Sequence, residues 1–305
     1  MLTIFTTAKA FRGHNGIIQR NAIKSWLLLH PKVEIILFGD DEGSSEMAQE
    51  LGLRHVPTLR KNESNAILIS DMFAQAQAMA THDVLCYANC DIILLDDFWK
   101  AQMRVREAHK SFLMIGRRWD ADIVEPIDYT VPGAKEQLIR RAKEQGHQRG
   151  PDCVDYFVFT RGLYADLPEF VIGRLWWDQW LVWKAMDSKH PVIDVSPVVM
   201  AIHQNHDYNH HPGGWKAVWE GAEPKRNLEL AGGKSNLRTM DDVTHIMSEG
   251  EEKKHFWRWW APYGRYLGPK VRPVWFALLG VTRPVRKLLG LRAKASVGSA
   301  EEAKS

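Results

Sequence analysis

Short apolar runs alternate with segments of helical periodicity along the first 90 residues of the chain. The runs LTIFTT, VEIILFG and DVLCYAN are continuous and rich in β-branched residues, as in strands buried on both faces. Between the first two runs, Ile18, Ala22 and Trp26 recur at helical spacing. We therefore predict strands over 2–7, 33–39, 54–56 and 83–89, and helices over 15–29, 45–51 and 70–81. This alternation predicts an α/β fold with a mostly parallel central sheet flanked by helices.

The pattern is less regular in the second half of the chain. Strands are predicted over 112–119, 155–160 and 191–206, helices over 134–145 and 175–186, and loops over 213–250. No internal repeat is evident. The predicted organisation is a catalytic domain over 1–215, a loop or linker region over 216–252, a basic aromatic segment over 253–295 and a disordered tail over 296–305.

Composition and charge narrow the class of protein. The chain has 305 residues and a net charge of +3, yet eleven Lys and Arg and no Asp or Glu lie between Lys253 and Lys294, so the body is net acidic. Three cysteines form neither a disulfide framework nor a CxxC pair, which favours a reducing compartment. No signal-peptide pattern and no apolar run of about 18 residues is found, so we expect a cytoplasmic protein.

A polar cluster, Asn89-Cys90-Asp91, ends the predicted strand over 83–89. Parallel sheets bind ligands beyond the carboxyl ends of their strands. A carboxylate there can ligate Mg²⁺ or Mn²⁺, with diphosphate oxygens completing the shell. The alternative is that Asp91 only caps the turn that follows it.

Further charged clusters follow other predicted strands. Asp40-Asp41 either accepts hydrogen bonds from a ribose or base, or caps the next helix. Arg60 and Asn62 precede a helix, and cations at a helix N-terminus suit phosphate, although a solvated loop explains them equally well. Arg117, next to Arg118, is either a contact of a diphosphate or acidic acceptor, or a surface ion-pair residue.

The stretch WWDQWLVW, residues 176–183, places Asp178 among four tryptophans. Aromatic faces suit sugar rings, and an apolar surrounding raises the pKa of a carboxyl toward that of a general base. The alternative is a core helix whose first-turn Asp only favours the helix dipole. Asp155, before YFVF, is the rival base or an acceptor contact.

Four histidines lie in HQNHDYNHHPGG, residues 203–214. His203 and His206 are spaced so that two imidazoles can share a metal ion, and zinc is one reading of that spacing. Zinc lacks support from neighbouring cysteines. A His-rich loop that makes ordinary hydrogen bonds is the other alternative.

The order of these motifs resembles the nucleotide-sugar glycosyltransferases of the GT-A fold, family-2-like, over roughly residues 2–212. The resemblance implies a Rossmann-like GT-A domain in which Asp91 faces the metal, His203 completes the metal site with His206 as its rival, and Asp178 is the base. It also implies nucleotide-sugar contacts at Thr6, Thr7, Arg12, Asp40, Asp41 and Asn89. The family's metal motif carries a first carboxylate where this chain has Asn89.

The segment 253–295 interleaves tryptophan and tyrosine with cations. Such residues favour the headgroup region of an anionic membrane, and VWFALLGV is too short to cross one. A nucleic-acid arm and a packed subdomain are the alternatives. The acidic body and several prolines argue against nucleic acid.

These features together predict a divalent-metal-assisted glycosyltransferase at the inner face of a membrane. The resemblance implies transfer with inversion, and transfer with retention is the alternative. Its predicted partners are a nucleotide-diphosphate sugar donor, a glycan or lipid-linked acceptor, Mn²⁺ or Mg²⁺, and an anionic membrane surface, with no nucleic acid. Two other functions stay open: a sugar nucleotidyltransferase, for which TTAKAFRGHNG is a poor phosphate loop, and a non-catalytic nucleotide-sugar-binding module at a membrane.

Overall fold

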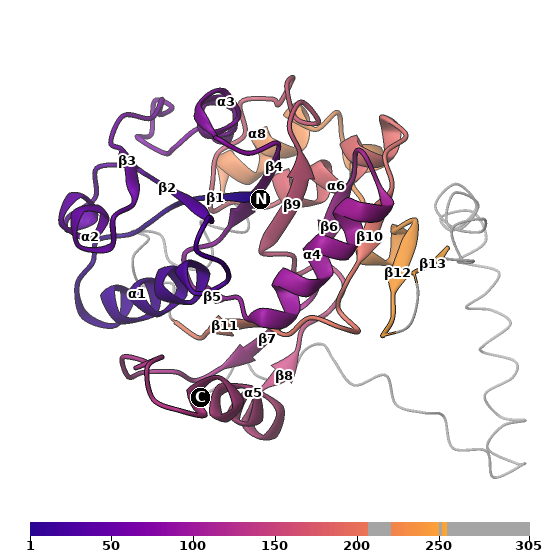
Figure 1. The fold of residues 1–305 in the computed structure, drawn as a ribbon. Helices are drawn as coiled ribbons and strands as arrows, with labels where there is room; N and C mark the ends of the chain where they lie inside the picture. Colours follow the sequence, from indigo (N-terminus) through magenta and orange to yellow (C-terminus); the bar gives the residue numbers. More distant parts are fainter. Residues whose placement is uncertain (207–220, 250–251, 255–305) are drawn as a thin grey trace, which may run out of the picture. The chain divides into compact units, whose positions relative to one another are not determined.

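The computed structural model describes residues 1–206, 221–249 and 252–254. Its largest element is a sheet of nine strands (Figure 1). In spatial order they are β13 (Glu252–Lys254), β12 (His245–Met247), β10 (Val192–Asp194), β6 (Leu113–Ile115), β9 (Tyr156–Thr160), β4 (Val84–Ala88), β1 (Leu2–Thr7), β2 (Glu34–Phe38) and β3 (Arg54–Val56). All neighbouring pairs are parallel except those made by β9 and β13. The predicted α/β fold with a mostly parallel central sheet is therefore confirmed.

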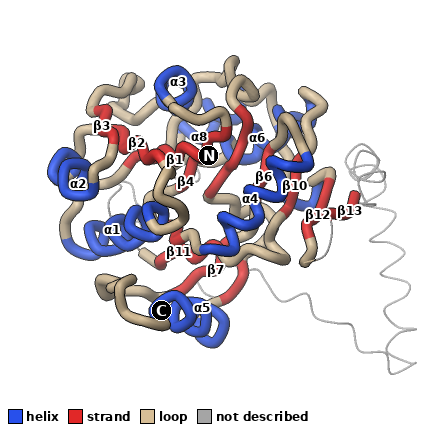
Figure 2. Tube along the Cα trace, in the orientation of Figure 1, coloured by secondary structure: helices blue, strands red, loops and turns tan. Residues whose placement is uncertain are grey.

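Helices cover both faces of this sheet (Figure 2). They are α1 (Gly13–Leu27), α2 (Ser44–Leu51), α3 (Ile69–Met79), α4 (Asp96–Ala108), α6 (Trp177–Asp187) and α8 (Ala222–Leu230), with short 3₁₀ turns η1 (Lys234–Asn236) and η2 (Met240–Asp242). The remaining helix, α5 (Ala134–Gln145), packs against a smaller second sheet. Because side chains alternate along a strand, Ile4 packs under α1 and α4 while Phe5 packs under α3 and α6. The core is thus two apolar layers on either side of the sheet.

A second sheet of four strands lies beside the first. Its order is β5 (Ile92–Ile93), β11 (Ala201–Gln204), β7 (Arg118–Ala121) and β8 (His147–Gln148). The predicted single strand over 112–119 is therefore wrong, because it divides into β6 and β7 in different sheets. Gly116 lies at the division, where an added Cβ would come within 2.0 Å of Tyr156 Oη. The predicted strand region 191–206 divides in the same way, into β10 and β11.

The region 216–252, predicted to be loop or linker, contains α8 and β12 in its described part. β12 pairs in parallel with β10 and so extends the central sheet. Helix α8 is mostly polar, which concealed it in the sequence. Its buried Asn227 bonds the backbone of Val171 on both the N–H and the C=O, at 3.0 and 3.1 Å, and so joins the helix to the body.

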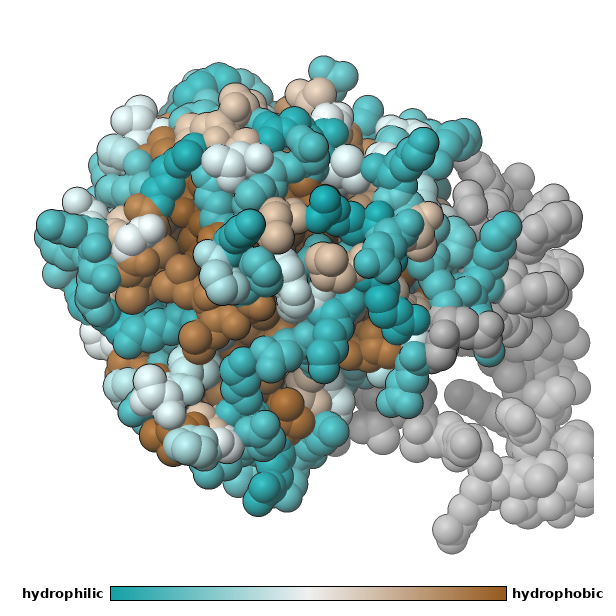
Figure 3. All heavy atoms as spheres, viewed as in Figure 1, coloured by the Kyte–Doolittle hydropathy of each residue, from teal (hydrophilic) through white to brown (hydrophobic). Residues whose placement is uncertain are grey.

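Apolar side chains also reach the surface near α1, β1 and β2, where polar residues border them (Figure 3). None of the described helices is long and apolar enough to pass through a bilayer. The predicted basic aromatic segment and tail lie outside the described residues, apart from Lys253 and Lys254 in β13.

Candidate active site

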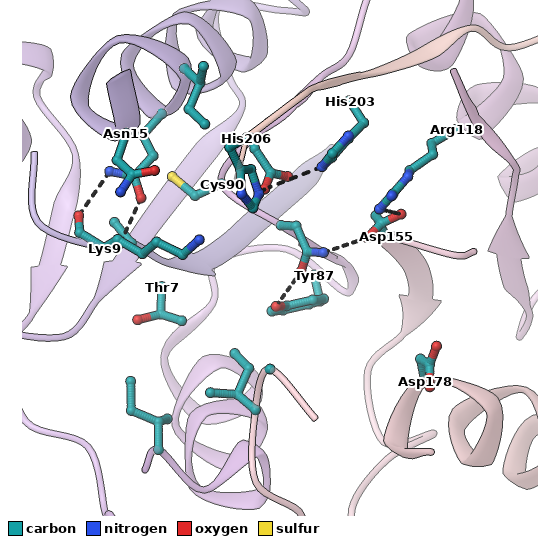
Figure 4. Close-up of a pocket in the computed structure, with 18 of the residues that line it drawn as sticks. Thr7, Lys9, Asn15, Tyr87, Cys90, Arg118, Asp155, Asp178, His203 and His206 are labelled. Carbon is teal, nitrogen blue, oxygen red and sulfur yellow. Dashed lines mark hydrogen bonds and ion pairs between the residues drawn. The ribbon is translucent and has the colours of Figure 1, made fainter. Parts of the chain in front are cut away.

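A pocket of about 450 Å³ opens beyond the carboxyl ends of β1 and β4. Parallel sheets place ligand sites at this edge. Several separate segments meet there, from the loop after β1 to the start of α6 and the end of β11 (Figure 4). Its polar and charged lining includes Thr7, Lys9, Asn15, Gln19, Tyr87, Asn89, Asp91, Arg118, Asp155, Arg174, Asp178, His203 and His206.

Asp91, His203 and His206 form a group of potential ligands in this pocket, with one donor atom from each within 4.8 Å of the others. Asp91 Oδ2 lies 3.1 Å from His206 Nε2 and 3.8 Å from His203 Nε2. Strand register explains the proximity, because His203 on β11 pairs with Ile92 on β5, the residue directly after Asp91. The structure therefore brings together the three predicted metal ligands.

The charges in this group stabilise one another. Burial alone would raise the pKa of Asp91, but His203, and then His206 and Lys9, bring that pKa well below its usual range. Burial acts to lower the pKa of His203, yet the negative charges of Asp91 and Asp120 raise it overall. The carboxylate is therefore ionised and ready to receive a cation.

The donor set of this group fits a divalent metal ion. Asp91 Oδ1 is buried without a hydrogen-bond partner among the described residues, so it is left for a ligand. His203 Nδ1 lies 3.2 Å from Asp120 Oδ1 as an ion-pair contact, and the opposite ring nitrogen, Nε2, is on the side of Asp91. One carboxylate and two imidazoles suit Mn²⁺ better than Mg²⁺, which prefers an oxygen shell.

Asp178 lies in the first turn of α6, across the pocket from the two histidines (Figure 4). The helix begins after Trp176, whose φ of 88° turns the chain sharply into it. Asp178 Oδ1 is buried without a partner among the described residues. Burial raises the pKa of Asp178 to about 7, with Asp155 adding to the rise, while the N–H groups of Gln179 and of Asp178 itself oppose it. A carboxyl with this pKa can exchange protons near neutrality.

Asn89 and Asp155 lie opposite each other where β4 ends and the antiparallel β9 begins. Asn89 Nδ2 donates to Asp155 Oδ1 at 2.6 Å, and Arg118 donates to Asp155 Oδ2 at 2.9 Å. Both carboxylate oxygens of Asp155 are therefore engaged. Asp178 has an oxygen left over and Asp155 does not, so the two predicted bases have different surroundings.

Thr6 and Thr7, two of the predicted nucleotide contacts, are the last two residues of β1. Thr7 lines the pocket, and its buried hydroxyl has no partner among the described residues. Thr6 is fully buried, and its hydroxyl donates to the carbonyl of Thr7 at 3.3 Å. Of the two, only Thr7 is placed to meet a ligand in this pocket.

The other predicted nucleotide contacts besides Asn89 do not line the pocket. Their partners are Glu42 for Arg12, Lys61 for Asp40, Glu169 for Arg60, Glu223 for Asn62 and Asp241 for Arg117. Burial raises the pKa of Asp41, with Lys61 opposing the rise. The role of these residues in nucleotide binding stays a prediction.

Several lining residues were missed in the sequence. Lys9 belongs to the loop after β1, which Gln19 holds by accepting from Lys9 N at 2.6 Å and donating to Lys9 O at 2.9 Å. Arg174 precedes α6, and its Nε lies 2.6 Å from Glu223 on α8. Lys9 has a signal in the sequence, a cation in the loop after the first strand. The place of Arg174 depends on a helix that the sequence did not reveal.

Comparisons with known proteins give distant likenesses of structure. No family model matches the chain, and no curated protein matches it. Among solved structures it is similar to glucosyl-3-phosphoglycerate synthase from Mycobacterium tuberculosis in complex with Mg²⁺ and UDP, at 14% identity and a TM-score of 0.46, over 76% of this chain and 80% of that one. It is also similar to S. aureus TarS 1–349 in complex with UDP-GlcNAc, at 11% identity and a TM-score of 0.45, over 68% and 59% of the two chains.

Proposed function

We propose that this chain is a glycosyltransferase that moves a sugar from a nucleotide-diphosphate sugar to an acceptor hydroxyl. One observation carries the proposal. A single pocket at the carboxyl edge of a mostly parallel sheet has, at one end, three side chains that can ligate a cation and, at the other, a carboxyl whose pKa is raised to about 7. Sugar transfer from a diphosphate needs both, because charge develops on the leaving group while the acceptor loses a proton.

Asp91, His203 and His206 would hold Mn²⁺ or Mg²⁺, and their imidazoles favour Mn²⁺. When bound, such an ion offsets the negative charge on the departing diphosphate. Lys9 lines the same part of the pocket and lowers the pKa of Asp91, so its ammonium adds positive charge where the diphosphate would lie. Thr7, with its unpartnered hydroxyl, suits a hydrogen bond to the nucleotide.

Asp178 is the base in this reaction, because Asp155 has both oxygens engaged. Its carboxylate accepts the proton of the acceptor hydroxyl as that oxygen bonds to the anomeric carbon. The bond from this carbon to the diphosphate breaks, and its electron pair leaves on the diphosphate oxygen. A single displacement from the opposite side inverts the configuration of the anomeric carbon.

The acceptor belongs to the part of the pocket around Asp178. Trp177 lines that part, and an aromatic face packs well against the apolar face of a sugar ring. A glycan acceptor fits this surface. The basic aromatic sequence over 253–295 supports a cell-envelope or lipid-linked glycan met at an anionic membrane surface.

A thermal-shift measurement tests the proposal. The full chain is titrated with UDP- and GDP-sugars, with and without Mn²⁺, beside the Asp91→Asn variant. We expect a sugar nucleotide to raise the Tm of the wild type, with a larger rise when Mn²⁺ is present, and the Mn²⁺-dependent part to be lost in the variant. If no sugar nucleotide shifts the wild type under any condition, the glycosyltransferase function is wrong.

A further inference from the structure

The position that lacks the expected carboxylate, Asn89, is fixed at both ends of its side-chain amide. Its Oδ1 accepts from the hydroxyl of Tyr87 at 2.8 Å, and its Nδ2 donates to Asp155 Oδ1 at 2.6 Å. Its backbone N–H also donates to the carbonyl of Asp155 at 2.9 Å. An amide meets both demands, since it has an acceptor at one end and a donor at the other.

A carboxylate at position 89 would repel the carboxylate of Asp155, whereas the amide of Asn89 donates a hydrogen bond to it. The last pair in the ladder of β4 and β9 is Ala88 with Tyr156, so the next residues along, Asn89 and Asp155, stand opposite each other. Like charges directly opposite in an antiparallel pair are destabilising, more so when buried, and Asp155 is only 8% exposed. Asp155 therefore dictates an amide at position 89.

Arg118 holds Asp155 in place and links it to Asp120, which lies beside the metal-site residue His203. Its guanidinium donates to Asp155 Oδ2 at 2.9 Å and, through Nε, to Asp120 Oδ1 at 2.8 Å. The same oxygen of Asp120 lies 3.2 Å from His203 Nδ1. One partly buried guanidinium thus holds Asp155, the partner of Asn89, and Asp120, the neighbour of His203, at the same time.

We propose that Arg118 is the positioning residue of the metal site, and that Asn89 is a fixed part of this assembly rather than the remnant of a lost carboxylate. Arg118 acts through Asp120 on the orientation of His203, and through Asp155 and Asn89 on the strand end that presents Asp91. The site is thereby specified to bind its ion with one carboxylate and two imidazoles. This inference rests on the metal site of the proposed function.

Mn²⁺ affinity of the full chain, measured from the spin-resonance signal of free Mn²⁺, tests the role of Arg118 without any transfer assay. Loss of such outer partners of a ligand weakens metal binding by about 10- to 100-fold, which we expect for Arg118→Met. Arg118→Lys should shift in the same direction, because one ammonium cannot hold both carboxylates as the planar guanidinium does. The Lys variant also keeps the charge if the Met variant does not fold.

The matched control is Arg54→Met. Arg54 also pairs with a largely buried carboxylate, Glu34, at 3.0 Å, but it lies on the edge strand β3 and does not line the pocket. We expect its Mn²⁺ affinity to stay within about twofold of the wild type. If the Arg118 variants that fold, whether one or both, bind Mn²⁺ as the wild type does, the inference is overturned.

The demand for an amide is tested by exchanging the two residues. Asn89→Asp should lower the Tm by about 5 °C or more, since it sets two carboxylates against each other. The double variant Asn89→Asp with Asp155→Asn keeps the total charge and returns a donor to face an acceptor, so it should recover part of the loss, while the ion pair of Arg118 with Asp155 stays lost. An unchanged Tm in the single variant, or no recovery in the double one, would contradict the inference.

These outcomes separate the inference from the proposed function. If the wild type binds Mn²⁺ but no sugar nucleotide, the glycosyltransferase proposal fails, and the Mn²⁺ affinities still decide the role of Arg118. If the wild type binds sugar nucleotides and Arg118→Met leaves Mn²⁺ affinity unchanged, only the inference fails. If the wild type binds no Mn²⁺, the inference fails, and the thermal shift with sugar nucleotides still decides the glycosyltransferase proposal.

Discussion

Asp91 and Asp178 face the same pocket from opposite ends, and the pKa values of their carboxyl groups are shifted in opposite directions. Asp91 and Asp178 are each partly buried, and each has one oxygen without a partner among the described residues. Two imidazoles beside Asp91 bring its pKa well below the usual range, whereas Asp178 has no adjacent cation among the causes of its shift, and burial raises its pKa to about 7. The neighbours, rather than the carboxyl itself, make one group a cation ligand and the other a base.

The largest effect is expected from removing the base. Asp178→Asn should lower kcat by about 10³-fold, because a positioned general base contributes 10²- to 10⁴-fold, while Mn²⁺ affinity stays as in the wild type. Steady-state transfer assays and Mn²⁺ titration measure the two quantities. Asp187→Asn, an exposed carboxylate at the other end of α6, is the control and should leave both unchanged. If Asp178→Asn also lost Mn²⁺ affinity, the metal-binding end and the base end of the pocket would not have separate roles.

The converse experiment removes an imidazole from the metal end. His206→Ala should weaken Mn²⁺ binding by about 100-fold, since it deletes one of three ligands, and excess Mn²⁺ should restore part of the transfer rate. His190→Ala changes a histidine outside the pocket lining and serves as the control. Transfer that stays lost at every Mn²⁺ concentration, despite full occupancy, would mean that His206 does more than hold the ion.

The pH dependence of kcat/KM sharpens the assignment of Asp178. The carboxyl must be ionised to accept a proton, and its pKa is raised to about 7. The rate should therefore fall about tenfold for each pH unit below 7 and level off above it. Mn²⁺ affinity measured at the same pH values identifies any contribution from the imidazoles. A flat profile between pH 5 and 7, taken at full Mn²⁺ occupancy, would exclude Asp178 as the base.

The smallest effect is on stability. The pKa of Asp178 is raised from 3.8 to about 7 on folding, so the folded chain keeps a proton that the unfolded chain releases between these values. Stability is therefore lost as the pH rises through this window. Asp178→Asn should remove that loss and raise the Tm by about 3 °C at pH 8, with little change at pH 4. An equal change at both pH values would point to packing instead of ionisation.

Much of this site was predictable because parallel strands direct their carboxyl ends to one edge. Asn89-Cys90-Asp91 ends a strand whose apolar run is evident, and His203 and His206 end the last predicted strand region. Asp178 was found from the tryptophans around it. Each of these residues owes its place to the element it ends or begins, which periodicity reveals.

The rest depends on partners far away in the chain. Arg118 and Arg117 are adjacent in sequence, yet β7 directs the first toward Asp155 and the pocket, while the second reaches Asp241 at 3.8 Å. Arg117 was the predicted contact, whereas Arg118 is the one that lines the pocket. The turn at Gly116, the parallel addition of β12 and the contact of Asn62 with Glu223 on α8 are likewise decided by tertiary packing.

The proposed ion has a consequence for the folded chain beyond its part in the reaction. Asp91 follows β4 of the nine-stranded sheet, while His203 is on β11 of the four-stranded sheet. Asp91 also directly precedes β5, which pairs with β11, so an ion held by both is a crosslink where the two sheets meet, and separation of β5 from β11 would first require its release. A ligand that binds only the closed form favours that form by mass action. The concentration of available metal would therefore set the resistance of this edge to proteolysis as well as the rate of transfer in the pocket.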